Sequence, residues 1–315
     1  MEEKVLLKKE GYKAYLIINR PDKLNAIDMD IYRLINKYLV DLDEDDNIRV
    51  VILKGAGKAF SAGWDVSCTE HHDMIGTRYI NEHICNDNRW KIWKLRKPVI
   101  AQVHKYCLGG ACELVLPCDY VYISEDCQIG EPEIQFGDQP CWLEIPWLVN
   151  MRKATELLLT GEKISGKEAA ECGLATKAFP EEELEAAVEA LADKLITISP
   201  PCMMNQKRGL HMVYEIQGMS AAITQWENMM LWPRVQETEE VKRFNKAVDL
   251  VGVGRAMKWK DNYFGRAAKY DTEKANIWDD AFNKVVAAIK AKHPDDRKAA
   301  NAEIDEYLTN EKEAI

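Results

Sequence analysis

Short apolar runs alternate with helical patterns through the first 125 residues, and this alternation limits the folds that the chain can adopt. Four runs, at 14–19, 50–54, 99–103 and 120–124, have the length and apolar character of buried strands. Between the first two, apolar residues recur at helical spacing on one face: Ile27, Ile31, Leu34, Ile35, Tyr38, Leu39 and Leu42. The pattern predicts an α/β core in which helices cover sheets.

The remainder of the chain has mainly helical patterns. From 181 to about 251 the spacing is largely helical, and Pro200 with Pro201 breaks this stretch into separate helices. After about 261, two further amphipathic helices are expected, with apolar faces at Trp278, Phe282, Val285, Val286 and Ile289, and at Ile304, Tyr307 and Leu308. We therefore predict a core at 1–200, a helical region at 201–260 and a helical extension at 261–315.

Charge and composition exclude several classes of protein. A net charge of −10 argues against nucleic acid as the main partner, because phosphate binding needs a basic surface. No stretch reaches the ~18 uncharged apolar residues of a membrane-spanning helix. The start of the chain lacks the features of a signal peptide, and nine scattered cysteines favour free thiols. These features predict a cytoplasmic protein.

Two glycine-containing motifs each follow an expected strand. The first, Gly55-Ala-Gly-Lys-Ala-Phe-Ser-Ala-Gly-Trp-Asp65, is a turn of small residues through which backbone amides can approach a ligand. The second, Leu108-Gly-Gly-Ala-Cys-Glu-Leu114, predicts a helix N-terminus whose amides face an anion, with Glu113 near the same point. Taken alone, either motif also suits a tight connection or a closely packed helix.

A third motif, Gly130-Glu-Pro-Glu133, follows the run at 120–124. Pro132 fixes the backbone and would hold Glu133 at a defined angle. An isolated glutamate in such a loop is by default a solvated carboxylate. The three motifs therefore indicate a function only when their order and spacing along the chain are considered together.

In that order, Phe60-Ser-Ala-Gly-Trp-Asp65, Gly109-Gly-Ala-Cys-Glu113 and Pro132-Glu133 resemble the crotonase (enoyl-CoA hydratase/isomerase) superfamily. The opening Asn19-Arg-Pro-Asp-Lys-Leu-Asn-Ala26 is also similar to that family, and the resemblance covers roughly residues 5 to 260. It implies a spiral of ββα units that carries the coenzyme A site and the active site. It further implies a C-terminal helical oligomerisation region, with the last helices outside the family pattern.

The resemblance implies roles for particular residues. The backbone amides of Trp64 and Gly110 match the oxyanion hole that binds the thioester oxygen as charge develops on it. Glu113 and Glu133 match the two acid/base glutamates of the hydratase branch. Segments that cradle coenzyme A match two groups of residues: Lys23, Asn25 and Ala26, and Ala62, Gly63 and Asp65.

The sequence departs from linear-chain hydratases in the loop after Glu133, where glycines are usual. Here the side chains expected to line the acyl pocket are Asp138, Cys141, Trp142 and Glu144. Aromatic and apolar walls suit a flat ring, so a cyclic or bulky acyl group is expected. The alternative is that Trp142 faces outward against a neighbouring subunit and leaves a linear pocket.

The leading interpretation is an enoyl-CoA hydratase-like lyase that adds water to, or removes it from, an unsaturated acyl-CoA. One alternative is a hydrolase of the same fold that acts on a cyclic β-oxoacyl-CoA. Another is a non-catalytic subunit that binds coenzyme A. No metal or separate cofactor is expected, because coenzyme A arrives with the substrate. The family pattern implies a homotrimer or a hexamer of two trimers.

Overall fold

The computed structural model describes residues 3–66, 75–230, 239–268 and 280–313. Their contacts separate into two compact units. The first contains residues 1–134 and 139–232, and the second contains 135–138 and 233–315. In the described residues, no helix is long and apolar enough to cross a membrane.

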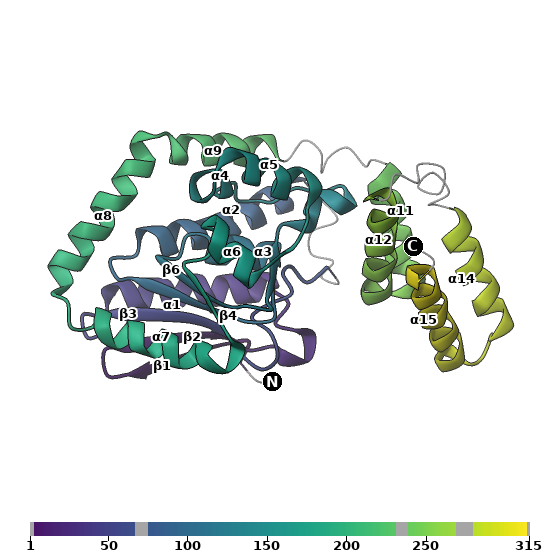
Figure 1. Cartoon of the computed structure of the whole chain (residues 1–315), viewed down its shortest axis with the longest axis horizontal. Coiled ribbons are helices and arrows are strands. Elements are labelled where there is room, and N and C mark those ends of the chain that lie inside the picture. The colour runs from purple at the N-terminus through teal and green to yellow at the C-terminus, as the bar shows by residue number, and fades with distance from the viewer. Residues whose placement is uncertain (1–2, 67–74, 231–238, 269–279, 314–315) are drawn as a thin grey trace. The chain divides into compact units, whose positions relative to one another are not determined.

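Six strands form the main sheet of the first unit, in the order β1-β2-β3-β4-β6-β9 (Figure 1). Their bounds are Val5–Glu10, Lys13–Ile18, Val50–Gly55, Val99–Val103, Tyr120–Ser124 and Lys177–Phe179. Only β1 and β2 pair antiparallel, and the other neighbours pair parallel. The four strands expected from the sequence are therefore confirmed, within one residue at each end.

A second sheet, in the order β5-β7-β8, lies at the ends of the main strands. These short strands are Tyr106–Leu108, Gln128–Gly130 and Ile164–Ser165. Both β5 and β7 precede a candidate motif directly, because α3 (Gly110–Val115) follows the first and the 3-10 turn η3 (Pro132–Phe136) follows the second. Since β5 and β7 pair in parallel, the two motifs leave the sheet side by side.

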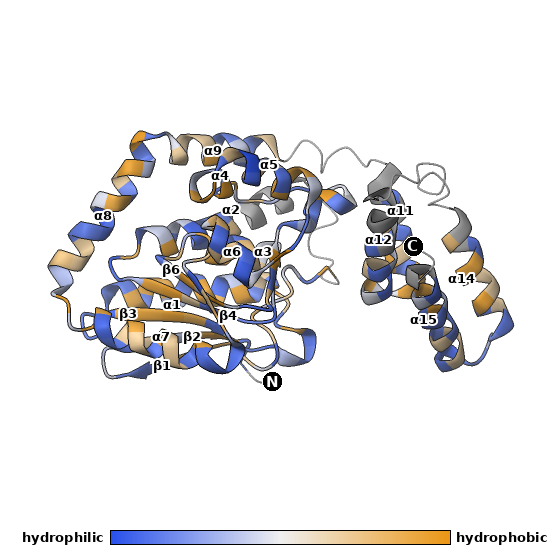
Figure 2. Ribbon diagram, viewed as in Figure 1, coloured by the Kyte–Doolittle hydropathy of each residue, from blue (hydrophilic) through white to orange (hydrophobic). Residues whose placement is uncertain are grey.

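Helices cover both faces of the main sheet, as the alternating pattern predicts. Alternate side chains of one strand, such as Val51 and Leu53 of β3, pack with α1 (Met29–Glu44) in the main core. Their neighbours Val50 and Ile52 pack instead with α7 (Glu181–Leu195). Figure 2 shows the apolar strands between helices that are hydrophilic on their outer sides.

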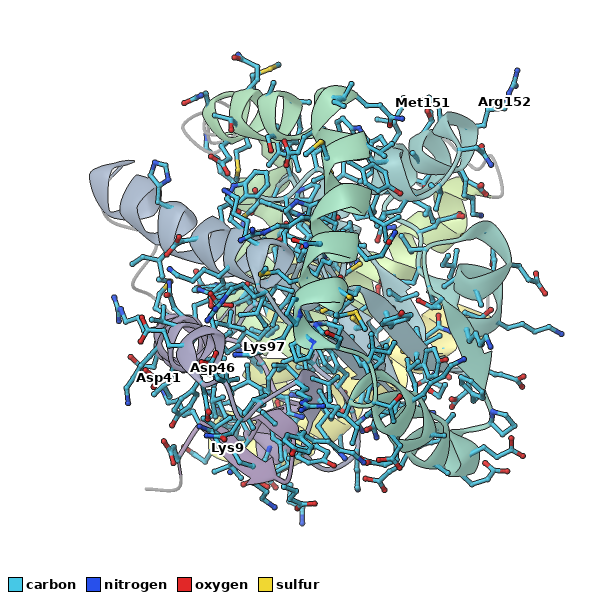
Figure 3. All side chains as sticks on the ribbon, turned by 90° about the vertical axis from the view of Figure 1, so that its left-hand side faces the viewer. Lys9, Asp41, Asp46, Lys97, Met151 and Arg152 are labelled. Carbon is cyan, nitrogen blue, oxygen red and sulfur yellow. The ribbon has the colours of Figure 1, made fainter. Side chains whose placement is uncertain are left out.

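The first unit contains further helices. They are α2 (Ile75–Lys94), α4 (Ile145–Leu148), α5 (Met151–Thr160), α6 (Gly166–Cys172), α8 (Pro200–Ile216) and α9 (Met219–Met229). Met151 and Arg152 project outward at the start of α5 (Figure 3), and Met151 is 66% exposed. Lys97, also labelled in Figure 3, is buried. Its ammonium group donates to the carbonyls of Leu42 and Asp43 at the end of α1.

The second unit is a small helical body with its own core. Its helices are α11 (Glu239–Val251), α12 (Val253–Ala268), α14 (Asp280–Lys292) and α15 (Arg297–Glu313). The two terminal helices expected from periodicity are confirmed, although Trp278 lies outside the described residues. Phe282, Val286 and Ile304 are buried together in this core, so the expected apolar faces do pack on one another.

Candidate active site

The glycines of the second motif bring two backbone segments into contact. Gly109 has φ 53° and ψ −128°, a conformation that side chains with a β-carbon rarely adopt, and it places Gly110 as the first residue of α3. A first helical residue has no intrahelical acceptor for its amide. A β-carbon on Gly110 would lie 3.9 Å from the backbone nitrogen of Trp64, so the two amides expected to form an oxyanion hole are neighbours.

The segment that carries Trp64 is held by a parallel bridge to Ile27. Gly63 has φ 92°, and a β-carbon there would meet the carbonyl oxygen of Leu108 at 2.3 Å. Glycine is therefore required for this segment to lie against the end of β5. The ring of Trp64 stacks on Tyr32, with centroids 6.2 Å apart.

The two segments expected to cradle coenzyme A lie side by side. The amide of Ala62 donates to the carbonyl of Leu24 at 2.9 Å, and the amide of Ile27 donates to the carbonyl of Gly63 at 2.8 Å. The carbonyl of Ala26 accepts from the guanidinium of Arg20 at 2.7 Å. The structure thus brings residues 23–26 and 62–65 into one cradle.

Two side chains of this cradle serve to shape it. Asn25 is fully buried, and its amide donates to the carbonyls of Ala56 and Ala59, both at 2.8 Å. Asp65 accepts from Arg20 at 3.0 Å and from Lys23 at 3.3 Å. Lys23 itself is half exposed, so it is the most exposed of these three charged groups.

Glu113 lies one turn into α3 and is buried to 1% exposure. One of its oxygens, Oε2, accepts from the guanidinium of Arg89, a fully buried residue of α2. The other oxygen, Oε1, accepts from the backbone amides of Cys141 and Trp142, the latter at 3.2 Å. Donors to both oxygens stabilise a carboxylate in its ionised form and fix its direction.

Glu133 lies in η3, and its carboxylate reaches back to Gly109. A β-carbon on Gly109 would stand 2.2 Å from Oε1 of Glu133. The two catalytic candidates are thus brought together, since Gly109 precedes the helix that carries Glu113. Both carboxylates also act electrostatically on Glu131, which stands between β7 and η3.

Glu131 is buried, and the thiol of Cys112 is the side chain that approaches its carboxyl as a weak hydrogen-bond partner. Burial, together with the charges of Glu133 and Glu113, raises its pKa well above the ordinary value. Burial and the charge of Glu131 likewise raise the pKa of the Cys112 thiol. A raised pKa favours the neutral form of Glu131, which limits the negative charge that gathers beside the two glutamates.

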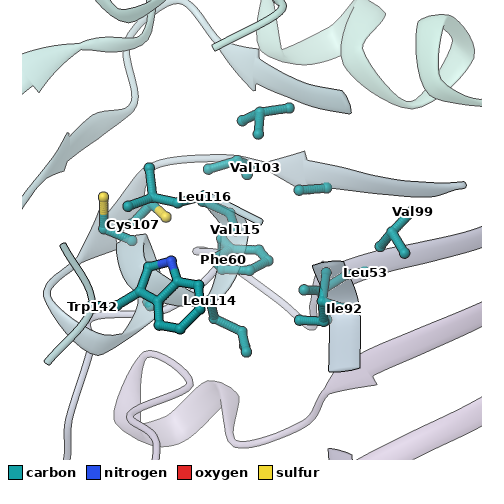
Figure 4. Close-up of a cluster of buried hydrophobic side chains, with 14 of the residues drawn as sticks. Leu53, Phe60, Ile92, Val99, Val103, Cys107, Leu114, Val115, Leu116 and Trp142 are labelled. Carbon is teal, nitrogen blue, oxygen red and sulfur yellow. The ribbon is translucent and has the colours of Figure 1, made fainter. Parts of the chain in front are cut away.

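The residues expected to line the acyl pocket have different positions. Trp142 is buried in the main core close to Leu114 (Figure 4), and its ring meets Trp90 edge-on at 4.7 Å. The indole nitrogen donates to the buried carboxyl of Glu144 at 2.5 Å. Burial raises the pKa of Glu144 to about 7. The alternative in which Trp142 faces outward is therefore wrong.

Cys141 touches the site through its backbone amide, and its side chain is half-buried. Asp138 belongs with residues 135–138 to the second unit, and we therefore do not assign it to this site. The lining of an acyl pocket by Asp138, Cys141, Trp142 and Glu144 stays a prediction. Among the residues described, no group of His, Cys, Asp and Glu could hold a metal ion.

Sequence reasoning missed Arg89, Tyr32 and Glu131. The Tyr32 hydroxyl lies 3.3 Å from the guanidinium of Arg89 and 3.4 Å from the carbonyl of Gly110. Glu131 is part of the third motif, where a second carboxylate flanking Pro132 was an available signal. For Arg89 there was none, because a single arginine in a helix has no distinctive local pattern.

Comparison with known proteins agrees with this geometry. Residues 10–261 match the family model described as enoyl-CoA hydratase/isomerase. A probable mitochondrial enoyl-CoA hydratase of Dictyostelium discoideum is 33% identical over 66% of this chain and 75% of its own length. A short-chain-enoyl-CoA hydratase of Clostridium acetobutylicum is 32% identical over 66% of this chain and 80% of its own.

Two further proteins extend the comparison: a relative named as an isomerase, and a protein of known crystal structure. A peroxisomal Delta(3,5)-Delta(2,4)-dienoyl-CoA isomerase of Arabidopsis thaliana is 32% identical over 69% of this chain and 84% of its own length. The crystal structure of an enoyl-CoA hydratase/isomerase from Xanthobacter autotrophicus Py2 superimposes with a TM-score of 0.79 and 29% identity, over 83% of this chain and 98% of that one. The chain therefore belongs to the enoyl-CoA hydratase/isomerase family, the crotonase superfamily, as a hydratase-like lyase with the crotonase fold.

Proposed function

We propose that this chain adds water across the α,β double bond of an enoyl-CoA, using Glu113 and Glu133 beside an oxyanion hole. The observation that carries the proposal is the meeting of four groups at the start of α3. The amides of Trp64 and Gly110 are neighbours, the carboxylate of Glu133 lies against Gly109, and Glu113 follows these two glycines in α3. Relatives of this chain are named as hydratases and as an isomerase. Of these two activities, we propose hydration, because both carboxylates are present.

The chemistry follows from what hydration needs. The thioester oxygen accepts hydrogen bonds from the amides of Trp64 and Gly110, which stabilise the charge that develops on it. A water held by Glu113 and Glu133 forms its bond to the β-carbon and gives up a proton to a carboxylate. A proton from a carboxyl group is delivered to the α-carbon, so one water is added and coenzyme A stays attached.

Coenzyme A enters with the substrate, and its cradle is the paired backbone at 23–26 and 62–65. Neither a metal nor a redox cofactor is part of the proposed chemistry, because the oxyanion hole already stabilises the developing charge. Activity should therefore persist after chelation with EDTA. We also propose a cytoplasmic location and a homotrimeric or hexameric assembly.

For the acyl group, we propose a cyclic or otherwise bulky unit. The loop that holds Glu113 through the amides of Cys141 and Trp142 carries a large aromatic side chain where glycines are usual in linear-chain hydratases. Trp142 packs on Trp90 in the core, and its indole is anchored to Glu144, so the loop that binds Glu113 is held in place. A loop held in this way favours a flat ring over a flexible chain, because a ring loses little conformational freedom on binding.

The test is to incubate the purified protein with several acyl-CoAs and to follow their masses. Crotonyl-CoA, a longer linear enoyl-CoA and a cyclohexadienoyl-CoA are compared under one set of conditions. A gain of one water with coenzyme A retained supports hydration, whereas release of free coenzyme A indicates hydrolysis and an unchanged mass indicates a binding subunit. The ring preference fails if kcat/KM for a linear substrate is higher by tenfold or more.

A further inference from the structure

The guanidinium of Arg89 meets the carboxylate of Glu113, and it comes from α2, outside every motif that the sequence revealed. It is 1% exposed. Removing a guanidinium from water costs several kcal/mol unless a partner compensates. The partner here is the carboxylate of Glu113, which lies 24 residues away in the sequence.

Tyr32, Asn86 and Glu113 together orient the guanidinium. Nη1 donates to the side-chain oxygen of Asn86, one turn earlier in α2. Nη2 donates to Glu113 and lies 3.3 Å from the hydroxyl of Tyr32, whose ring is 5.7 Å from the guanidinium carbon. Side chains of α1 and α2 thus fix the position of the cation, and the cation fixes one oxygen of Glu113.

The electrostatic surroundings make this cation important. Burial is the strongest effect on Arg89 and opposes its charge, but Glu113, with smaller contributions from Tyr32, Cys141 and Cys85, raises the pKa of Arg89 above its ordinary value. Glu131 and Glu133 face the same point, and Glu131 has a raised pKa because it is buried among carboxylates. Without the guanidinium, Glu113 would be a third carboxyl in one buried cluster, and such a cluster favours protonation. The other titratable groups that act on Arg89 or on its partners are Tyr32, Cys85, Cys141 and Glu227.

We propose that Arg89 is a positioning residue of the hydratase site, which keeps Glu113 ionised and aligned with the amides of Cys141 and Trp142. The inference rests on the proposed function and deepens it. Arginine does not exchange protons at neutral pH, so Arg89 acts through Glu113 rather than as an acid or a base. Glu113 thereby meets the attacking water as a preformed, oriented acceptor in each turnover.

The test uses Arg89→Met, Arg89→Lys, Glu113→Gln and the double variant Arg89→Met/Glu113→Gln. The substrate is the enoyl-CoA that the wild type hydrates fastest. Arg89→Met should lower kcat by ~10²-fold with little change in KM, because the reacting carboxylate loses its alignment. Arg89→Lys should recover part of kcat. The double variant should be no slower than Glu113→Gln alone, since the arginine has no further role once its partner is neutral.

Two readouts separate positioning from a general structural effect. In Arg89→Met the acid limb of the kcat–pH profile should move to higher pH, because Glu113 now protonates more readily. In Arg89→Ala, which leaves space, added guanidinium chloride at millimolar concentration should raise kcat, and sodium chloride should not. The matched control is Lys207→Met, which removes a buried cation bonded to Asp119 at 2.6 Å elsewhere in the same unit. It should lower the melting temperature and leave the pH profile unchanged.

The proposal is overturned if the single losses of Arg89→Met and Glu113→Gln multiply in the double variant, or if the acid limb does not move. Unfolded variants are recognised by circular dichroism, and Arg89→Lys then serves in place of Arg89→Met. If the wild type hydrates no enoyl-CoA, the proposed function fails, but the ion pair is still tested by urea unfolding of the same four proteins. A coupling below about twofold in the unfolding equilibrium constant would then disprove the link between Arg89 and Glu113.

Discussion

The carboxylate of Glu133 rests directly against the α-carbon of Gly109, where a β-carbon would stand 2.2 Å from its Oε1. Gly109 also has φ 53° and ψ −128°, and it is the residue that turns the chain from β5 into α3. One glycine therefore sets the backbone turn before α3 and leaves room for the carboxylate of Glu133.

From this contact we expect Gly109→Ala to inactivate the enzyme. The added methyl group would displace Glu133, and the backbone conformation would be strained, so kcat should fall by ~10²-fold or more. Steady-state kinetics and thermal melting check this. The control is Gly254→Ala in α12, where a β-carbon meets nothing within 4 Å, and its kcat should be unchanged. Near-normal turnover in Gly109→Ala would show that Glu133 works from another position.

We expect Glu113→Gln and Glu133→Gln each to lower turnover by ~10²–10⁴-fold, the usual effect of losing an acid/base group. Binding of coenzyme A should survive, because the proposed cradle at 23–26 and 62–65 contains neither glutamate. Turnover and calorimetric titration with coenzyme A measure the two effects. Glu162→Gln, an exposed glutamate, is the control. A single variant with near-normal turnover would remove that glutamate from the mechanism.

We expect Glu144 to make the protein less stable as the pH rises. Its pKa is about 7 in the folded protein and 4.5 in an ordinary environment, so folding retains a proton that the unfolded chain releases between these values. The free energy of unfolding should therefore fall by about 3 kcal/mol from pH 4.5 to pH 7 and then level off. Urea unfolding of the wild type and of Glu144→Gln, which keeps an acceptor for the Trp142 indole, gives the difference. Parallel pH curves for the two proteins would contradict the assignment.

We expect the apolar side chains of α8 to form an interface between copies of the chain. Leu210, Met212, Val213 and Ile216 are 52–80% exposed, which is costly for a monomer. The double variant Leu210→Glu/Ile216→Glu should have a lower mass by light scattering than the wild type. Leu159→Glu makes a like change at an exposed position of α5 and should keep the assembly. A wild type of 36 kDa at micromolar concentration would rule the interface out.

The sequence was sufficient to predict the features that depend on a local pattern of residues. Buried strands such as Val99–Val103 are short apolar runs, and Glu113 and Glu133 stand in motifs whose spacing is distinctive. It did not suffice for contacts between distant residues. Arg89 meets Glu113 because α2 packs beside α3, and nothing near Arg89 in the sequence marks that contact.

The loop after Glu133 illustrates a second limit. The composition of this loop predicted that its aromatic and acidic side chains would line the acyl pocket. In the structure, the loop contacts Glu113 through its backbone. The amides of Cys141 and Trp142 bind Glu113, while the indole turns into the core toward Glu144. Side-chain identity reveals little about which backbone groups a loop presents, since every residue except proline carries the same donor.

The core of the second unit has a consequence for truncation. The family pattern ends at residue 261, within α12, whereas the ring of Trp259 in that helix stacks on Phe282 of α14 at 4.7 Å. A protein shortened at the family boundary would keep one half of this core and lose the other. The severed apolar face of α11 and α12 would then be an aggregation surface, so a soluble shortened form should end near residue 232 instead.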